Sequence, residues 1–290
     1  MKTRLIRYWK PLLAMIFWGT SFIATKVALE ELTPLMIIFF RLVFAITLLL
    51  IIAMYTKRDF SIRVKSHGWI ILLAVIASFH LWIQVTGLQY TTATNTGWII
   101  GTAPVFMAIL GFIFFKERLT LLKISGIIIA FAGLLLLITN GEISKLNFLT
   151  NKGDFLILAS AFTWSVYSMV NKKITINYPP LMTIFFLFIM MAVIIGPFTI
   201  SNDYLLATLH LSFKGWGAVL FLGIFCSGIS YVLWSQALSE MEATKTGAFL
   251  YFEPFVTVIS AWVLLNENIT SMIIVSGLVI MLGVYLVNSK

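Results

Sequence analysis

The chain has 290 residues, of which 60% are hydrophobic and only 11% are charged, and its mean hydropathy is +1.01. Soluble domains carry about twice this charged fraction and cannot bury so much apolar surface in one core. The composition therefore excludes an ordinary soluble protein and predicts a polytopic membrane protein. The net charge of +9 does not indicate nucleic-acid binding, because the basic residues lie between hydrophobic segments.

Ten apolar segments follow one another along the chain, each long enough to cross a hydrocarbon layer of about 30 Å as a helix. They are continuous runs rather than alternating patterns, which favours an all-α protein over a β-barrel. The first half contains the predicted spans 9–29, 35–55, 69–88, 94–115 and 121–139. After a polar linker at 140–153, the second half contains 155–172, 181–200, 216–238, 244–265 and 271–287.

Lysine and arginine are unequally distributed between the two sets of loops, and this bias sets the orientation of a membrane protein. With the N-terminus inside, fifteen basic residues lie on the inner side and four on the outer side. An even number of helices returns the C-terminus to the inner side, so we predict a cell-membrane protein with both termini in the cytoplasm. The inner residues are Lys2, Arg4, Arg7, Lys10, Lys57, Arg58, Arg63, Lys65, Lys116, Arg118, Lys123, Lys172, Lys173, Lys245 and Lys290. The outer residues are Lys26, Lys145, Lys152 and Lys214, and Arg41 lies within the second span.

The two halves of the chain repeat each other. At a constant offset of 150, stretch 243–270 repeats the residue types of Ala93, Thr94, Thr96, Gly97, Pro104, Glu117 and Thr120. At an offset of 146, Trp164, Lys172 and Pro180 repeat Trp18, Lys26 and Pro34. Five helices per repeat is an odd number, so the second copy must be inserted upside down. Inverted repeats of this kind are typical of secondary transporters, whose substrate site lies near the midplane between the halves.

Several motifs carry a family resemblance across the whole chain. They are FWGTSFIATK at 17–26, Pro34, Arg41, TAP at 102–104, KERLT at 116–120, Ser125-Gly126 with Gly133, Glu253-Pro254 and NENIT at 266–270. Together they resemble the EamA-like branch of the drug/metabolite transporter superfamily. The resemblance implies ten helices in two inverted five-helix repeats, with a central cavity lined mainly by helices 1, 3, 4, 6, 8 and 9. Members of the family move amino acids, other metabolites, vitamins or drugs, most often outward in bacteria.

Glu253 is the carboxylate that lies deepest in any predicted span, and it has no counterpart in the first repeat. Ala103 occupies the corresponding position, just as Leu187 corresponds to Arg41. A buried carboxylate can pair with a cationic substrate group or exchange a proton, and ionisable residues within membranes commonly serve such functions. The alternative is a structural hydrogen bond to a neighbouring helix, near the backbone gap left by Pro254.

Further polar and aromatic residues are candidates for the walls of a cavity. His80 and Gln84 are four residues apart and share one face of the third span, where they can bind substrate or join helices. Aromatic side chains on helices expected to face the cavity suit a moderately polar solute with an apolar part. Packing within the bundle is the alternative for each of them. These aromatic residues are Trp18, Trp164, Tyr231, Trp234 and Tyr251.

Two prolines and two basic residues are candidates for movement or gating. Pro104 and Pro254 each remove a backbone donor, so they predict bends that either act as hinges or shape the cavity. We expect Lys26 and Arg41 near the outer ends of the first two helices, as an outer gate or as side chains that snorkel to the interface. Lys26 can also pair with Glu30 one turn on. Glu117 and Glu267 precede Thr120 and Thr270, and we interpret them as features of helix ends.

These observations predict a secondary transporter that exports small organic metabolites, such as amino acids, related amphiphilic compounds or drugs, by alternating access. The five-helix repeats occupy 9–139 and 154–288. The alternative is uptake or facilitated diffusion of a vitamin, sugar or nucleoside. An enzyme is not expected, because no HExxH or GxSxG motif and no Cys/His metal spacing is present. The expected partners are a small solute and the lipid bilayer, with protons as the candidate coupling ion. No cofactor or nucleic acid is expected, and the predicted assembly is a monomer or homodimer.

Overall fold

The computed structural model describes residues 2–60, 67–139, 149, 151–175, 178–199, 208–265 and 271–289. Every regular element in these ranges is a helix. Eight helical segments are long and apolar enough to cross a membrane, and the apolar helices at Leu121–Leu136 and Ile274–Asn288 are shorter. The chain is therefore an all-helical, multi-pass membrane protein, as its composition predicts. Residues 140–148 and 150 of the predicted linker, and Glu267 with Thr270, lie outside the described residues.

The helices follow the predicted spans, with four of the spans divided into shorter elements. The first half contains α1 (Lys2–Leu29), α2 (Pro34–Tyr55), α3 (His67–Tyr90), α4 (Ala93–Ile100), α5 (Ala103–Phe115) and α6 (Leu121–Thr139). The second half contains α7 (Lys152–Thr175), α8 (Pro180–Ile195), the 3-10 helix η3 (Gly196–Thr199), α10 (Phe213–Phe221), the π-helix η4 (Leu222–Ile229), α11 (Ser230–Glu240), α12 (Ala243–Gly247), the 3-10 helix η5 (Ala248–Tyr251), α13 (Phe252–Leu265) and α14 (Ser271–Asn288).

Polar residues begin several of these helices. The hydroxyl groups of Thr33, Thr92 and Ser212 accept hydrogen bonds from backbone N–H groups in the first turns of α2, α4 and α10. Such caps satisfy donors that have no partner within the helix. Pro34 follows its cap directly, where a missing N–H costs nothing. The cap residues therefore explain where these three helices start.

The two corresponding spans 94–115 and 244–265 are both interrupted. In the first, α4 ends at Ile100 and α5 begins beyond Gly101 and Thr102, with Pro104 in its first turn. In the second, the 3-10 helix η5 separates α12 from α13, and Pro254 lies at the start of α13. Proline fits the first turn of a helix because its missing N–H has no partner there. Both predicted bends are therefore breaks that lie just before the proline.

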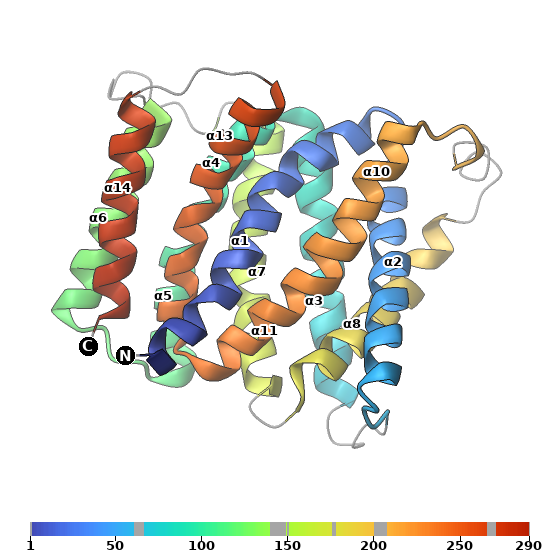
Figure 1. Cartoon of the computed structure of the whole chain (residues 1–290), viewed down its shortest axis with the longest axis horizontal. Coiled ribbons are helices and arrows are strands. Elements are labelled where there is room, and N and C mark those ends of the chain that lie inside the picture. Colours follow the sequence, from blue (N-terminus) through green and yellow to red (C-terminus); the bar gives the residue numbers. More distant parts are fainter. Residues whose placement is uncertain are drawn as a thin grey trace.

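Figure 1 shows α6 and α14 side by side at one edge of the bundle, with both chain ends at the same end of the molecule. Elsewhere α1 packs against α11 and α13, whereas α7 packs against α3 and α5. In the sequence repeat α7 corresponds to α1, α3 to the α10–α11 region and α5 to α13. The packing partners of the two halves therefore correspond as well. A cavity lies among α1, α3, α7, α11 and α13, and no residue of α6 or α14 lines it.

Candidate functional site

A small cavity at the centre of the bundle brings together side chains from α1, α2, α3, α4, α7, α11 and α13. Its volume is about 30 Å³, which is room for about two water molecules. Pockets that hold organic ligands measure roughly 300–1,000 Å³. The cavity in this structure is therefore smaller than pockets of that kind. Six of the predicted cavity residues line it, namely Trp18, His80, Gln84, Trp164, Tyr231 and Glu253.

Glu253 lies in the first turn of α13 and is only 4% exposed. Among the described residues, its carboxylate has no hydrogen-bond or ion-pair partner. The helix α13 packs closely against α1 at Gly19. A Cβ atom on this residue would lie only 2.8 Å from the Glu253 carbonyl oxygen. A buried carboxylate without a partner is costly unless a proton or a cationic group neutralises it. Glu253 therefore provides an acidic group that can take up either one.

Arg41, which we expected near the outer end of the second helix, lies in the wall of the same cavity. It is 4% exposed, and its Nε donates a hydrogen bond to Ser227 Oγ at 3.1 Å. Arg41 is the seventh residue after Pro34, where α2 begins, which places it about 10 Å along the helix. No ion pair joins Arg41 to Glu253 within 4.0 Å, although both line the cavity. The cavity thus holds one buried cation and one buried acid, apart from each other.

The π-helix η4 supplies polar groups at the edge of the cavity. Trp18 Nε1 donates to the carbonyl oxygen of Cys226 at 2.8 Å, and Ser230 Oγ donates to the carbonyl oxygen of Phe225 at 2.8 Å. A π-helical turn is wider than an α-helical one and occurs frequently at functional sites. The η4 segment therefore fixes Trp18 through its backbone and Arg41 through Ser227. Sequence patterns did not predict this element.

His80 is a buried residue of α3 that faces α7. Its Nδ1 lies 3.0 Å from the carbonyl oxygen of Ser160, so this nitrogen donates its proton and Nε2 is an acceptor in the neutral ring. Thr163 Oγ1 lies 3.4 Å from the same nitrogen. His80 thus makes the interhelical hydrogen bond that was one of its two predicted roles. It also lines the cavity, as does Gln84 one turn further along α3.

Aromatic rings form the apolar part of the site. Trp164 lies 4.9 Å from Trp18 and 5.5 Å from Tyr231, measured between ring centroids. The indole N–H of Trp164 is buried without a hydrogen-bond partner. Trp234 packs on Trp18 at 5.5 Å, and its Nε1 donates to Ser168 Oγ at 3.1 Å. The cavity wall therefore combines aromatic rings packed edge to face with the Trp164 N–H, which has no partner among the described residues.

Trp234 packs on Trp18 without lining the cavity, and the predicted site residues Tyr251 and Lys26 also lie away from the lining. The hydroxyl group of Tyr251 points toward α6, 3.4 Å from the carbonyl oxygen of Ile127. Lys26 lies in the last turn of α1 and makes no ion pair with Glu30, and it has no hydrogen-bond partner among the described residues. The predicted Lys26–Glu30 pair is therefore absent. Its counterpart Lys172 donates to the carbonyl oxygens of Leu238, at 2.9 Å, and Met241.

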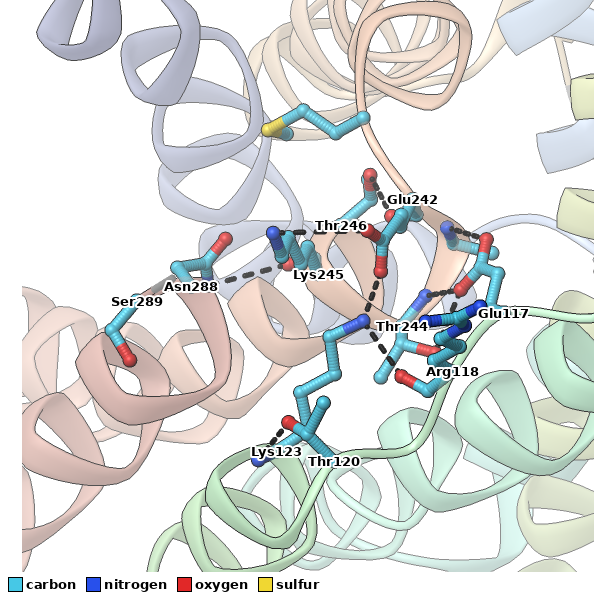
Figure 2. A network of polar contacts seen from close by, with 12 residues as sticks. Glu117, Arg118, Thr120, Lys123, Glu242, Thr244, Lys245, Thr246, Asn288 and Ser289 are labelled. Atoms are coloured by element: carbon cyan, nitrogen blue, oxygen red, sulfur yellow. Dashed lines mark hydrogen bonds and ion pairs between the residues drawn. The ribbon is translucent and has the colours of Figure 1, made fainter.

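At the end of the molecule that holds both chain ends, a polar network joins the two halves (Figure 2). Glu117 accepts hydrogen bonds from Ala243 N at 2.5 Å, Thr244 N at 2.9 Å and Thr244 Oγ1 at 2.8 Å. Lys123 pairs with Glu242, whose carboxylate is also 3.8 Å from Lys245. Glu117 is a helix-end feature, as predicted, but the helix that it caps is α12 in the opposite half.

The opposite end of the bundle has its own contacts between the halves. Glu31 accepts hydrogen bonds from Ser212 Oγ at 2.6 Å and Ser212 N at 2.7 Å, and these bonds hold the pKa of Glu31 below its ordinary value. Asp154 Oδ1 accepts bonds from Thr91 Oγ1 and Asn95 Nδ2, each at 2.6 Å. Contacts thus tie the halves at both ends of the bundle. Of the repeat-related lysines Lys26 and Lys172, only Lys172 has a hydrogen-bond partner among the described residues.

Comparison with known proteins identifies related chains that match over most of their length. The family model of the EamA-like transporter family matches residues 8–139 and again 151–289. An uncharacterized transporter of Archaeoglobus fulgidus is 30% identical over 96% of both chains. The uncharacterized transporter YyaM of Bacillus subtilis is 28% identical over 93% of this chain and 89% of its own. A crystal structure of another protein, 16% identical, has a TM-score of 0.77 over 97% of this chain and 96% of its own, which indicates a shared fold.

Proposed function

Because the chain belongs to the EamA-like transporter family, we propose that it is a secondary transporter that exports small organic metabolites across the cell membrane. Amino acids and related amphiphilic compounds are the proposed substrates. The observation that carries the proposal is the central cavity, where buried Arg41 and Glu253 lie together with aromatic rings. Such a site receives a solute with an anionic group, a cationic group and an apolar body.

The proposed architecture has ten transmembrane helices in two inverted five-helix repeats, at 9–139 and 154–288, with both termini in the cytoplasm. The matching packing partners of the two halves support it, as do chain ends that lie at the same end of the bundle (Figure 1). Inverted repeats allow one half to rock against the other around a fixed site. The cavity lies between the halves, as alternating access requires.

The lysines that repeat at offset 146 support alternating access. Lys172 binds the carbonyl oxygens at the end of α11, including that of Leu238. The corresponding partner for Lys26 would be Leu88 at the end of α3, and this bond is not formed between these described residues. The repeat-related residues Lys172 and Lys26 thus differ in one structure, because Lys172 is hydrogen-bonded to its carbonyl partners and Lys26 is not. We propose that the bonded and unbonded states exchange between Lys172 and Lys26 when the transporter reverses its access.

Glu253 gives the proposed transporter a means of coupling to protons. A cationic solute group and a proton neutralise the same carboxylate, so only one of them is bound at a time. The guanidinium group of Arg41 donates hydrogen bonds and holds the anionic end of the solute. Solute and proton therefore alternate at Glu253, which supports exchange of solute for protons.

Binding of charge-capped amino acids tests the two-charge site. Leucine carries both charges, N-acetyl-leucine only the carboxylate and leucine methyl ester only the ammonium group. We expect each capped form to bind at least tenfold more weakly than leucine, measured by the change in intrinsic tryptophan fluorescence of the purified protein, to which Trp18 and Trp164 in the cavity wall contribute. Arg41→Gln should remove the preference for leucine over its methyl ester, and Glu253→Gln the preference over N-acetyl-leucine. Equal binding of all three compounds to the unmodified protein contradicts the two-charge site.

A further inference from the structure

A second hollow lies on the outer surface of the bundle, in a groove of about 640 Å³ between α1, α14 and the junction of η5 with α13. This volume is within the roughly 300–1,000 Å³ of small-molecule sites. The groove does not share a lining residue with the central cavity. Its walls include Tyr8, Leu12, Phe249, Phe252, Met281 and Asn288.

The groove opens toward the hydrocarbon layer. Trp9, Met281 and Tyr285 line it and are 47%, 42% and 69% exposed. They belong to α1 and α14, which are apolar helices of a multi-pass membrane protein. Side chains exposed on such helices contact lipid. An occupant of this groove therefore enters from the membrane.

The polarity of the groove changes along its length. Tyr8 and Asn288 lie near the start of α1 and the end of α14, at the end of the bundle that holds both chain ends (Figure 1). Met281 is seven residues before Asn288, which places it about 10 Å deeper along α14. Leu12 and Phe252 continue the apolar part. A lipid of the adjacent leaflet has the same polarity, with its tail inside and its headgroup at the interface.

Asn288 presents an unsatisfied acceptor at the polar end. Its Nδ2 donates to the carbonyl oxygens of Val284 at 2.9 Å and Lys245 at 3.4 Å, and its Oδ1 is buried without a partner. Because both neighbours are acceptors, the amide nitrogen must face them. Figure 2 shows the Asn288 oxygen pointing away from Lys245. A buried acceptor without a donor destabilises the fold, so a ligand that supplies an N–H or O–H group is favoured here.

We propose that this groove binds one phospholipid whose headgroup donates a hydrogen bond to Asn288 and whose acyl chain lies along Leu12, Phe252 and Met281. An ethanolamine headgroup supplies N–H donors, whereas the quaternary ammonium of choline supplies none. The acyl chain also packs against Phe249 in η5. The bound lipid therefore supports the interrupted helix that carries Glu253. This site is independent of the solute that the protein transports.

Native mass spectrometry of the purified protein tests the lipid site after incubation with equal amounts of phosphatidylethanolamine and phosphatidylcholine. We expect one retained phosphatidylethanolamine, at least fivefold above phosphatidylcholine. Met281→Trp fills the groove and should reduce retention of both lipids at least fivefold. Leu282→Trp is the matched control, because Leu282 is 52% exposed on the same helix and does not line the groove. Asn288→Leu should retain lipid but bind the two headgroups equally.

Each part of the proposal has its own contradicting result. Equal retention of the two lipids by the unmodified protein overturns the role of Asn288. Retention in Met281→Trp that equals that of Leu282→Trp overturns the groove as the binding site. The melting temperature of each variant shows whether a loss of retention is due to misfolding. If Met281→Trp misfolds, the headgroup preference of Asn288→Leu decides whether the proposal stands.

Discussion

Replacing Glu253 by glutamine is expected to reduce solute flux driven by a pH gradient at least tenfold. Glutamine keeps the size of the side chain but cannot exchange a proton or neutralise a cationic group. The carboxylate has no other described partner whose loss would explain the effect. Flux into proteoliposomes, measured across a range of pH values, should therefore become independent of the gradient.

The matched control is Glu240→Gln, at the end of α11. Glu240 pairs with Lys10 outside the central cavity, and exposed ion pairs contribute less than about 1 kcal/mol. We expect its flux and its pH dependence to match those of the unmodified protein. If Glu253→Gln transports at the unmodified rate with the same pH dependence, Glu253 has no part in coupling.

Replacing Glu117 by alanine is expected to open the end of the molecule that holds both chain ends. The substitution leaves the N–H groups of Ala243 and Thr244 without their acceptor. Loss of buried partners of this kind costs about 3 kcal/mol, or roughly a hundredfold in the equilibrium between closed and open forms. The single cysteine, Cys226, is fully buried beside Trp18 and reports this change. Its reaction with N-ethylmaleimide should accelerate at least tenfold.

The control for this experiment is Glu242→Gln in the same network. Glu242 binds Lys123 and Lys245 with a partly exposed side chain, so its loss should change the labelling rate less than threefold. A single cooperative melting transition in Glu117→Ala separates opening from unfolding. Labelling of Glu117→Ala at the unmodified rate would show that the network does not hold the closed form.

Most of the central cavity could be predicted because buried polar groups are rare in apolar spans. Glu253 is an isolated carboxylate within its segment, and His80 with Gln84 forms a polar pair on one helix face. Trp18 and Trp164 occupy equivalent positions in the two halves, so the repeat indicates that they meet at the centre. The structure places all five side chains around the same small volume.

The surroundings of Tyr251, Arg41 and Glu117 depend on features that periodicity does not encode. Tyr251 ends the 3-10 helix η5, whose turn of three residues rotates the following side chains away from the positions of an α-helix. Arg41 is long enough either to snorkel or to reach inward, and only the contact with Ser227 in the π-helix η4 distinguishes the two. The partner of Glu117 lies in the opposite half of the chain, so no local pattern identifies it.

The most direct test of the proposed function is leucine uptake into proteoliposomes whose interior is more acidic than the outside. Exchange at Glu253 predicts that protons leaving the vesicle drive leucine inward, at least tenfold faster than in protein-free vesicles. Dissipating the gradient with a protonophore should remove this acceleration. Leucine uptake that is the same with and without the protein, while leucine binds to the purified protein, would contradict transport.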